Sequence, residues 1–235
     1  MIVDHDNHRV LEVLENREKA TVLAYLKQAK EGLLAQVEEV TTDMWDAYVT
    51  AAREALGSQV LVTIDRFHVM KNLQECLTGA RRELQRKLSA AERDELKGSR
   101  WLWQTNWENL TAEQQEQLTR LKQRFPELGA LADQRESLRA LFDDRTIQTS
   151  AAGRARLQGW LQQVQALGLT AMNRFAKTLT NWMDKIANYF VNRSSNGRTE
   201  GFNHGLRAVL WRAYGMTNFE NFRLRVLHCF GFTPA

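Results

Sequence analysis

Strand-forming patterns in this 235-residue sequence are confined to its first third. Short apolar runs predict strands at Met1–Val3, Val10–Leu14, Val37–Val40 and Val60–Ile64. From Val69 to about Phe190 such runs are absent, and leucines recur at helical spacing instead. A chain with this pattern cannot form an all-β fold, so we expect a small sheet joined to a large helical block.

The first third alternates strands with helices. Amphipathic patterns predict helices at Glu18–Gln36 and Met44–Leu56, and the turn-like segment Asp4–His8 predicts a hairpin. Three of the strands are followed within three residues by an aspartate, namely Asp4, Asp43 and Asp65. Because open α/β sheets bind ligands at their strand ends, these acids are candidates for a functional site.

The helical block is predicted to contain five or six helices. One helical face is predicted from Leu73, Leu77, Leu84 and Leu88. Two interpretations of the nearby tryptophans stay open: they form a platform on which nucleobases stack, or they fill the core of a helical bundle. These residues are Trp101, Trp103 and Trp107.

The order of these elements predicts the fold class α/β. We expect a ribonuclease-H-like mixed sheet that lacks its first strand and is interrupted by a large all-helical insertion. The predicted parts are residues 1–70, which hold the strands, residues 71–190, which form the insertion, and residues 191–235, the C-terminal helical part of the core. A fold does not dictate function, so function depends on particular residues.

Composition excludes several classes of protein. No apolar run approaches the roughly 20 residues that span a bilayer, and residues 1–10 lack the pattern of a secretory signal. Cys76 and Cys229 match neither a disulfide framework nor a zinc spacing, which favours packed thiols in a reducing cytoplasm. The net charge of +4 mildly favours an anionic partner.

The basic charge is concentrated near the C-terminus. From residue 191 onward the chain has six Arg and two Glu, a surplus as large as the net charge of the whole chain. A helix is predicted over Arg198–Trp211, and one face of it would carry Glu200, Asn203, Arg207 and Trp211. Glu200 is either a salt-bridge partner of Arg193 or Arg207, or a ligand of a divalent metal beside a phosphate backbone.

Two other acids also have competing interpretations. Asp43 is predicted to cap the helix that follows it, by accepting a backbone N–H, or to bind a divalent metal, and the two roles are compatible. Asp65 and His68 stand three residues apart at a strand-to-helix turn. They form either a local hydrogen bond that fixes the turn, or a pair in which His68 orients a carboxylate or contacts a phosphate.

Three ordered motifs resemble the catalytic region of bacterial insertion-sequence transposases of the DDE type, most closely the IS-L-three family. The motifs are VTTDMWDAY, VTIDRFHVMKNL and SSNGRTEGFNHGLRAVLWRAYGMTNFENFRLRVLH. The resemblance runs nearly end to end. It implies cleavage and joining of DNA strands at transposon ends with Mg²⁺ or Mn²⁺, in the bacterial cytoplasm at the nucleoid, with other transposase subunits as candidate partners.

Site residues follow from the resemblance by position. Asp43 resembles the second catalytic acid and Glu200 the third, and both would hold the metal. Asp65 and His68 fit an accessory Asp-x-x-His signature, with Asp65 as an alternative second acid. Asp43 is preferred because it follows the strand adjacent to the expected first one. Contacts with DNA are predicted at Arg198, Asn203, Arg207 and Arg212.

The family's first catalytic Asp lies upstream of the segment that matches MIVDHDNHRV. The chain is therefore predicted to be a truncated transposase fragment that is inactive alone, because one acid of the metal site is absent. The alternative is a non-catalytic module that binds DNA or transposase subunits and so modulates transposition.

Overall fold

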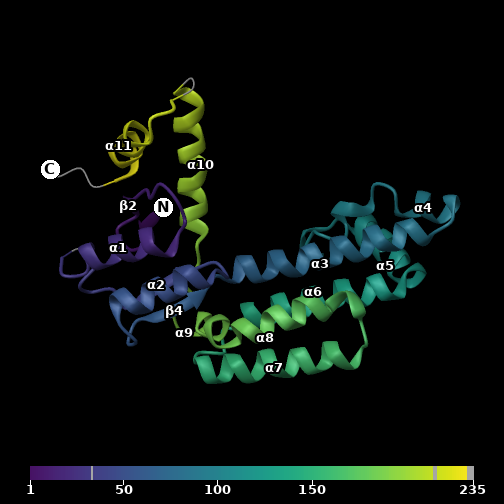
Figure 1. The fold of residues 1–235 in the computed structure, drawn as a ribbon. Coiled ribbons are helices and arrows are strands. Elements are labelled where there is room, and N and C mark those ends of the chain that lie inside the picture. Colours follow the sequence, from purple (N-terminus) through teal and green to yellow (C-terminus); the bar gives the residue numbers. More distant parts are fainter. Residues whose placement is uncertain (33, 214–215, 232–235) are drawn as a thin grey trace. The chain divides into compact units, whose positions relative to one another are not determined.

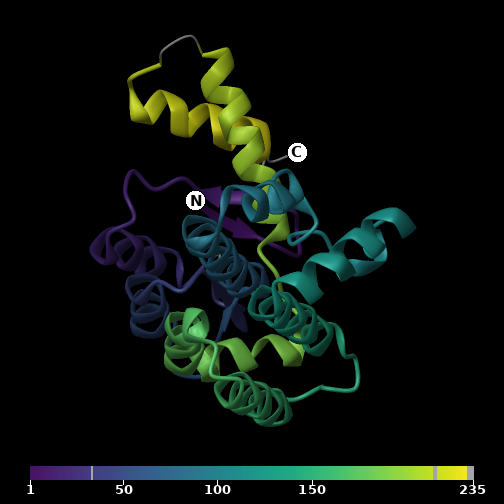
Figure 2. The ribbon, with the colours of Figure 1, turned by 90° about the vertical axis from the view of Figure 1, so that its right-hand side faces the viewer.

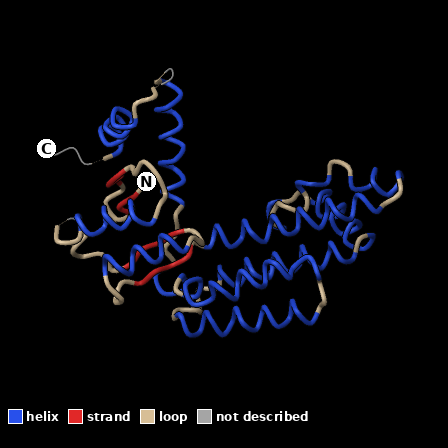
Figure 3. Tube along the Cα trace, viewed as in Figure 1, coloured by secondary structure: helices blue, strands red, loops and turns tan. Residues whose placement is uncertain are grey.

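A computed structural model describes residues 1–32, 34–213 and 216–231, with Arg198 described by its backbone alone. The fold is α/β, and it is mostly helical with small sheets (Figure 3). It divides into two compact units. We call Met1–Thr63 together with Ser194–Ala235 the strand-bearing unit, and Ile64–Arg193 the helical unit.

Four short strands form in the described chain, close to the predicted positions. They are β1 (Ile2–Asp4), β2 (Arg9–Glu12), β3 (Glu39–Thr42) and β4 (Leu61–Ile64). β1 and β2 form the expected antiparallel hairpin, with Val3 opposite Val10. Among the described residues the strands make two separate sheets, β1–β2 and β3–β4, rather than the single mixed sheet that the sequence pattern predicts.

The helices of the strand-bearing unit are α1 (Lys19–Ala29), α2 (Asp46–Leu56), α10 (Gly197–Arg212) and α11 (Phe219–Phe230). α1 ends seven residues before the predicted end at Gln36. Past the helix, the Leu34 N–H donates to Ala29 O in a compact turn that contains Gly32, a poor helix former. Leu34 is buried, so the apolar pattern continues beyond the helix because the turn packs against the core.

α10 and α11 form a helical pair beside the β1–β2 hairpin (Figure 1). Val10 and Val13 from the strand region are buried together with Val226 of α11. The Phe202 and Phe230 rings meet edge to face, with centroids 5.8 Å apart. The last helices of the sequence therefore complete a hydrophobic core that the first strands begin.

The helical unit contains seven α-helices, all in the described part of the chain, where five or six are predicted. They are α3 (Arg66–Lys87), α4 (Ala90–Leu96), α5 (Ala112–Arg124), α6 (Pro126–Asp143), α7 (Ser150–Ala166), α8 (Asn173–Ala187) and α9 (Tyr189–Asn192). Three 3₁₀ turns join them: η1 (Ser99–Trp101), η2 (Trp107–Asn109) and η3 (Thr170–Met172).

More helices form than the sequence pattern predicts, because two of them begin directly after the preceding helix. A capping box between Ser89 and Glu92 begins α4 directly after α3, and Pro126 begins α6 directly after α5. α3, α6, α7 and α8 pack side by side, and Figure 2 shows several of these helices nearly along their axes.

The core of the helical unit contains two of the predicted leucines, Leu73 and Leu77, at 1% exposure each. The three tryptophans do not share one role. Trp103 is 2% exposed and fills the core, whereas Trp101 is 68% exposed and Trp107 is 40% exposed. Helical spacing could not predict which of these tryptophans is buried, because the segment that carries them is a series of turns.

Candidate functional site

Asp43 follows β3 directly and has an exposed side chain. The capping interpretation is wrong, because α2 begins at Asp46 and its N-cap is Trp45, which makes no side-chain cap hydrogen bond. Burial lowers the pKa of the Met1 amino group, and the negative charges of Glu12 and Asp43 oppose that shift. The Asp43 carboxylate is therefore near enough to act on the charge of the Met1 amino group, within the strand-bearing unit.

Glu200 lies in the first turn of α10 and is partly exposed. The interpretation as a partner of Arg193 is wrong. The Arg193 guanidinium instead donates to the carbonyl oxygens of Phe142, Asp144 and Ile147, at 2.5–2.7 Å. In the described part of the chain Glu200 also forms no ion pair with Arg207. A carboxylate in the first turn of a helix is favoured by the helix dipole.

The first turn of α10 lies beside the β1–β2 turn. Thr199, the neighbour of Glu200, has its Oγ1 3.5 Å from Nε2 of His5. Asp43 and Glu200 thus both belong to the strand-bearing unit, and Thr199, next to Glu200, has a neighbour in the β1–β2 turn. The carboxylates of both residues make no hydrogen bond or ion pair with any other described side chain.

Glu39 is a positioning residue that the sequence did not reveal. It accepts a hydrogen bond from Thr63 Oγ1 on β4, and its other oxygen accepts one from Ser194 Oγ at 2.5 Å. Ser194 precedes α10, so Glu39 ties the start of the last segment to β3. The only sequence signal is a glutamate inside a strand pattern, three residues before the buried Thr42.

Asp65 and His68 lie in the helical unit. Asp65 is fully buried and caps α3, with its Oδ1 accepting the Phe67 N–H at 3.1 Å. Its Oδ2 has no hydrogen-bond partner in the described structure. Among these residues no hydrogen bond joins its carboxylate to His68, but the His68 N–H donates to the Asp65 carbonyl oxygen at 3.1 Å, so a local Asp–His hydrogen bond fixes the turn through the backbone. The His68 ring instead packs edge-on to Phe67.

The predicted DNA-binding positions lie along α10. Asn203 is half-buried, and Arg207 and Arg212 are exposed with no ion pair to a described residue. The Arg198 side chain lies outside the described residues. Trp211, on the same helix, is 84% exposed. The opposite side of α10 packs into the core through Phe202, Leu206 and Val209, so the polar positions stay outside it.

The donors present suit a hard divalent cation. Mg²⁺ binds few carboxylates and keeps several waters or phosphate oxygens as its other ligands. Asp43 and Glu200 are two carboxylates in one unit, and neither makes a hydrogen bond or ion pair with another described side chain. No group of three or more His, Cys, Asp or Glu residues that could hold a metal occurs in the part of the chain that the structure describes.

Comparison with known proteins identifies the class of protein. A sequence model of the DDE transposases of the IS-L-three type, described as "Transposase", matches residues 1–226. The chain therefore belongs to this family of DDE transposases.

The transposase for insertion sequence element IS1001 of Bordetella parapertussis is 28% identical over 233 residues. That match covers 98% of this chain and 56% of the relative, so the chain spans just over half of the relative's length. No solved structure matches the chain.

Two predictions from composition can be compared with the structure. No described helix is long and apolar enough to cross a membrane. Both cysteines are free, but they differ in environment. Cys76 is half-buried, and burial raises the pKa of its thiol. Cys229 is exposed, so its prediction as a packed thiol is wrong.

Proposed function

We propose that this chain supplies Asp43 and Glu200 to a transposase site that cleaves and joins DNA strands with Mg²⁺ or Mn²⁺. One observation carries the proposal. In a member of the DDE transposases, two carboxylates of the strand-bearing unit make no hydrogen bond or ion pair with another described side chain. Asp43 follows a strand and Glu200 begins a late helix, which is the order that the family resemblance implies.

The finer fold that we propose is a ribonuclease-H-like sheet. Its support is the way the four strands pair, as β1–β2 and as β3–β4. One further strand between these pairs would join them into a single mixed sheet and place Asp43 next to it. The helical unit would then be an insertion between β4 and α10, consistent with the chain order.

Each residue has a distinct role in this proposal. A bound Mg²⁺ or Mn²⁺ would activate the attacking oxygen and stabilise the leaving oxygen of the phosphoryl transfer. Asp43 and Glu200 hold it through carboxylate oxygens. Arg207 and Arg212 contact DNA phosphates, and Glu39 positions the segment that leads into α10. Asp65 is the weaker candidate for the second acid, because it is buried and one of its oxygens caps α3.

The proposal is tested by metal binding and by strand cleavage. With transposon-end DNA present, we expect the chain to bind Mn²⁺, measured by electron paramagnetic resonance. Asp43→Asn or Glu200→Gln should weaken that binding at least tenfold, because each removes a carboxylate ligand. Asp46→Asn is the matched control, since Asp46 is an exposed acid three residues from Asp43. Mn²⁺ binding unchanged in both site variants would overturn the proposal.

The expectation that the 235 residues are inactive alone is tested with the same DNA. We expect no strand cleavage by the purified chain with either metal. Robust cleavage would contradict that expectation. If such cleavage also persisted after both Asp43→Asn and Glu200→Gln, the assignment of these two acids would be wrong.

The second candidate function is a non-catalytic module that binds DNA or transposase subunits. It is favoured by the exposed Arg207, Trp211 and Arg212 on α10, which need no metal to contact DNA. Salt-dependent DNA binding that is unaffected by Glu200→Ala would support this function, provided that the chain shows no DNA-dependent Mn²⁺ binding.

A further inference from the structure

The helical unit contains an open groove of about 710 Å³. One wall is a face of α3 that extends from Phe67 to Arg82, and the other is the segment Arg100–Thr105 that includes the end of η1. Arg135 of α6 completes the lining. This volume lies in the range of sites that bind small ligands. The groove is therefore large enough for nucleobases to enter.

Of the four cations among the described lining residues, Arg135 is ion-paired with Glu136 and the other three are not paired. Lys71, Arg82 and Arg100 are exposed, and none of them forms an ion pair with a described residue. Glu75 is the one carboxylate among the described lining residues. Burial lowers the pKa of the adjacent Arg81, and the positive charges of Arg100 and Arg82 lower it further. These cations are therefore close enough to repel one another, and an anionic ligand would relieve that repulsion.

Two large aromatic side chains lie among these cations. Trp101 is 68% exposed and Phe67 is 53% exposed, and both line the groove. The Arg100 guanidinium lies 5.4 Å from the centroid of the Trp101 ring. Aromatic rings interleaved with cations are the usual composition of surfaces that bind single-stranded nucleic acid, because bases stack on the rings while cations bind the phosphates.

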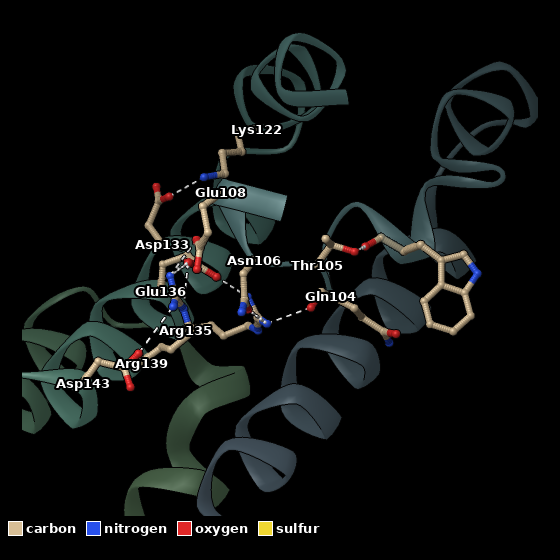
Figure 4. Close-up of polar contacts among 11 residues, drawn as sticks. Gln104, Thr105, Asn106, Glu108, Lys122, Asp133, Arg135, Glu136, Arg139 and Asp143 are labelled. Carbon is tan, nitrogen blue, oxygen red and sulfur yellow. Dashed lines mark hydrogen bonds and ion pairs between the residues drawn. The ribbon is translucent and has the colours of Figure 1, made fainter. Parts of the chain in front are cut away.

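The segment that carries Trp101 is fixed from within. Trp103 is buried, and its Nε1 donates to Ser99 Oγ at 3.1 Å. Gln104 donates to Thr78 Oγ1 on α3 at 3.3 Å. The Arg135 guanidinium donates to Gln104 O and to Asn106 Oδ1, each at 2.7 Å (Figure 4). The exposed indole therefore stands on an ordered turn, which reduces the entropy lost when a base stacks on it.

We propose that this groove binds unpaired DNA, with bases stacked on Trp101 and Phe67 and phosphates bound by Lys71, Arg82 and Arg100. Base faces are accessible only in single strands, so the aromatic groups favour unpaired DNA over a duplex. The inference rests on the proposed function in that its ligand is DNA. It requires neither a metal nor strand cleavage, and it assigns a role to the helical unit that Asp43 and Glu200 do not supply.

The test uses the full chain in EDTA, with fluorescein-labelled oligothymidylate and a duplex of the same length, by fluorescence anisotropy. Trp101→Ala should weaken oligothymidylate binding about tenfold and leave duplex binding unchanged, since one base–aromatic stack is lost. Replacing both Arg82 and Arg100 with Ala should reduce the salt slope for the single strand by about 1.4, since each phosphate contact contributes roughly 0.7.

Matched controls are available in the same unit. Trp107→Ala removes a partly exposed tryptophan outside the groove, and Arg174→Ala removes an exposed cation on α8. Neither should change oligothymidylate binding. Circular dichroism verifies that each variant is folded, which we expect because the altered side chains are exposed.

The possible results separate this inference from the proposed function. If the chain does not bind oligothymidylate, or binds it equally well after the groove substitutions, the groove proposal is overturned, whatever the metal experiment shows. If the groove substitutions act as expected while Mn²⁺ binding is insensitive to Asp43→Asn and Glu200→Gln, the proposed function fails and the groove assignment stands.

Discussion

Glu12 on β2 has the most buried carboxylate among the described ion pairs. Its two oxygens accept hydrogen bonds from Nε and Nη2 of Arg223 on α11, at 2.6 Å and 2.5 Å. Such a two-pronged contact is strong because both bonds are charge-assisted. It also raises the pKa of Arg223, chiefly through the hydrogen bond to Glu12, so the Arg223 guanidinium stays charged. The two residues are 211 positions apart, so spacing along the sequence could not predict that they pair.

Replacing Arg223 should therefore destabilise the chain. Arg223→Met leaves the Glu12 charge buried without its partner, and we expect the free energy of unfolding to fall by about 2–3 kcal/mol, somewhat reduced because the pair is partly exposed. Urea denaturation measures this. The control is Arg225→Met on the exposed side of α11, which should change stability by less than about 0.5 kcal/mol. Equal effects of the two substitutions would contradict a special role for the pair.

At the scale of single elements, α10 shows how one helix serves two purposes. Its inner positions pack into the core of the strand-bearing unit, while Glu200, Arg207 and Trp211 lie outside that core. Gly205 permits the close approach of α11, since a Cβ there would lie 2.6 Å from Cζ of Phe230. Gly201, one turn earlier, has no atom within 4 Å of the same position.

These two glycines give opposite predictions for the same substitution. Gly201→Ala should raise the free energy of unfolding by about 0.5–1 kcal/mol, because alanine is the better helix former and meets no atom. Gly205→Ala should instead lower it by about 1–2 kcal/mol, since Phe230 must shift and the gain in propensity is smaller than that strain. Thermal unfolding of the two variants measures the difference. Stabilisation by both would show that Phe230 does not pack against Gly205.

The helix ends show which elements the sequence could predict. The capping box of α4 and the proline at the start of α6 are local signals, and the helices begin where these residues stand. The end of α1 was mispredicted, because the buried Leu34 continues the apolar pattern into a turn. The cap of α2 was mispredicted because two residues, Met44 and Trp45, separate Asp43 from the helix.

On the scale of the whole molecule, the strand-bearing unit is assembled from both ends of the sequence. Val226 covers Val10 and Val13, and Ser194 binds Glu39. The helical unit is formed by one continuous stretch, from Ile64 to Arg193. Its helices bury their own core, with the Phe142 and Phe190 rings stacked 5.6 Å apart.

Removing residues 194–235 should therefore affect the two units differently. We expect amide hydrogen exchange in residues 9–13 to accelerate on the order of tenfold or more, because their hydrophobic cover and the Glu12 partner are lost. Exchange in the core helices α3 and α6 should stay close to that of the full chain. Mass spectrometry of peptides from both variants measures this. Uniform acceleration would show that the two units fold only together.

The sequence by itself determined the class of fold, the order of strands and helices in the first third, and the family, because these depend on local periodicity and on short motifs. It also placed Asp43 after a strand, and it placed Glu200 and Arg207 on a late helix. Tertiary structure alone decided which side chains are buried, paired or exposed. Asp65 became a buried cap, Arg223 the partner of Glu12, and Trp101 the most exposed tryptophan of its cluster. The physical reason is that burial and pairing depend on contacts between segments far apart in the chain, and spacing along the sequence does not encode them.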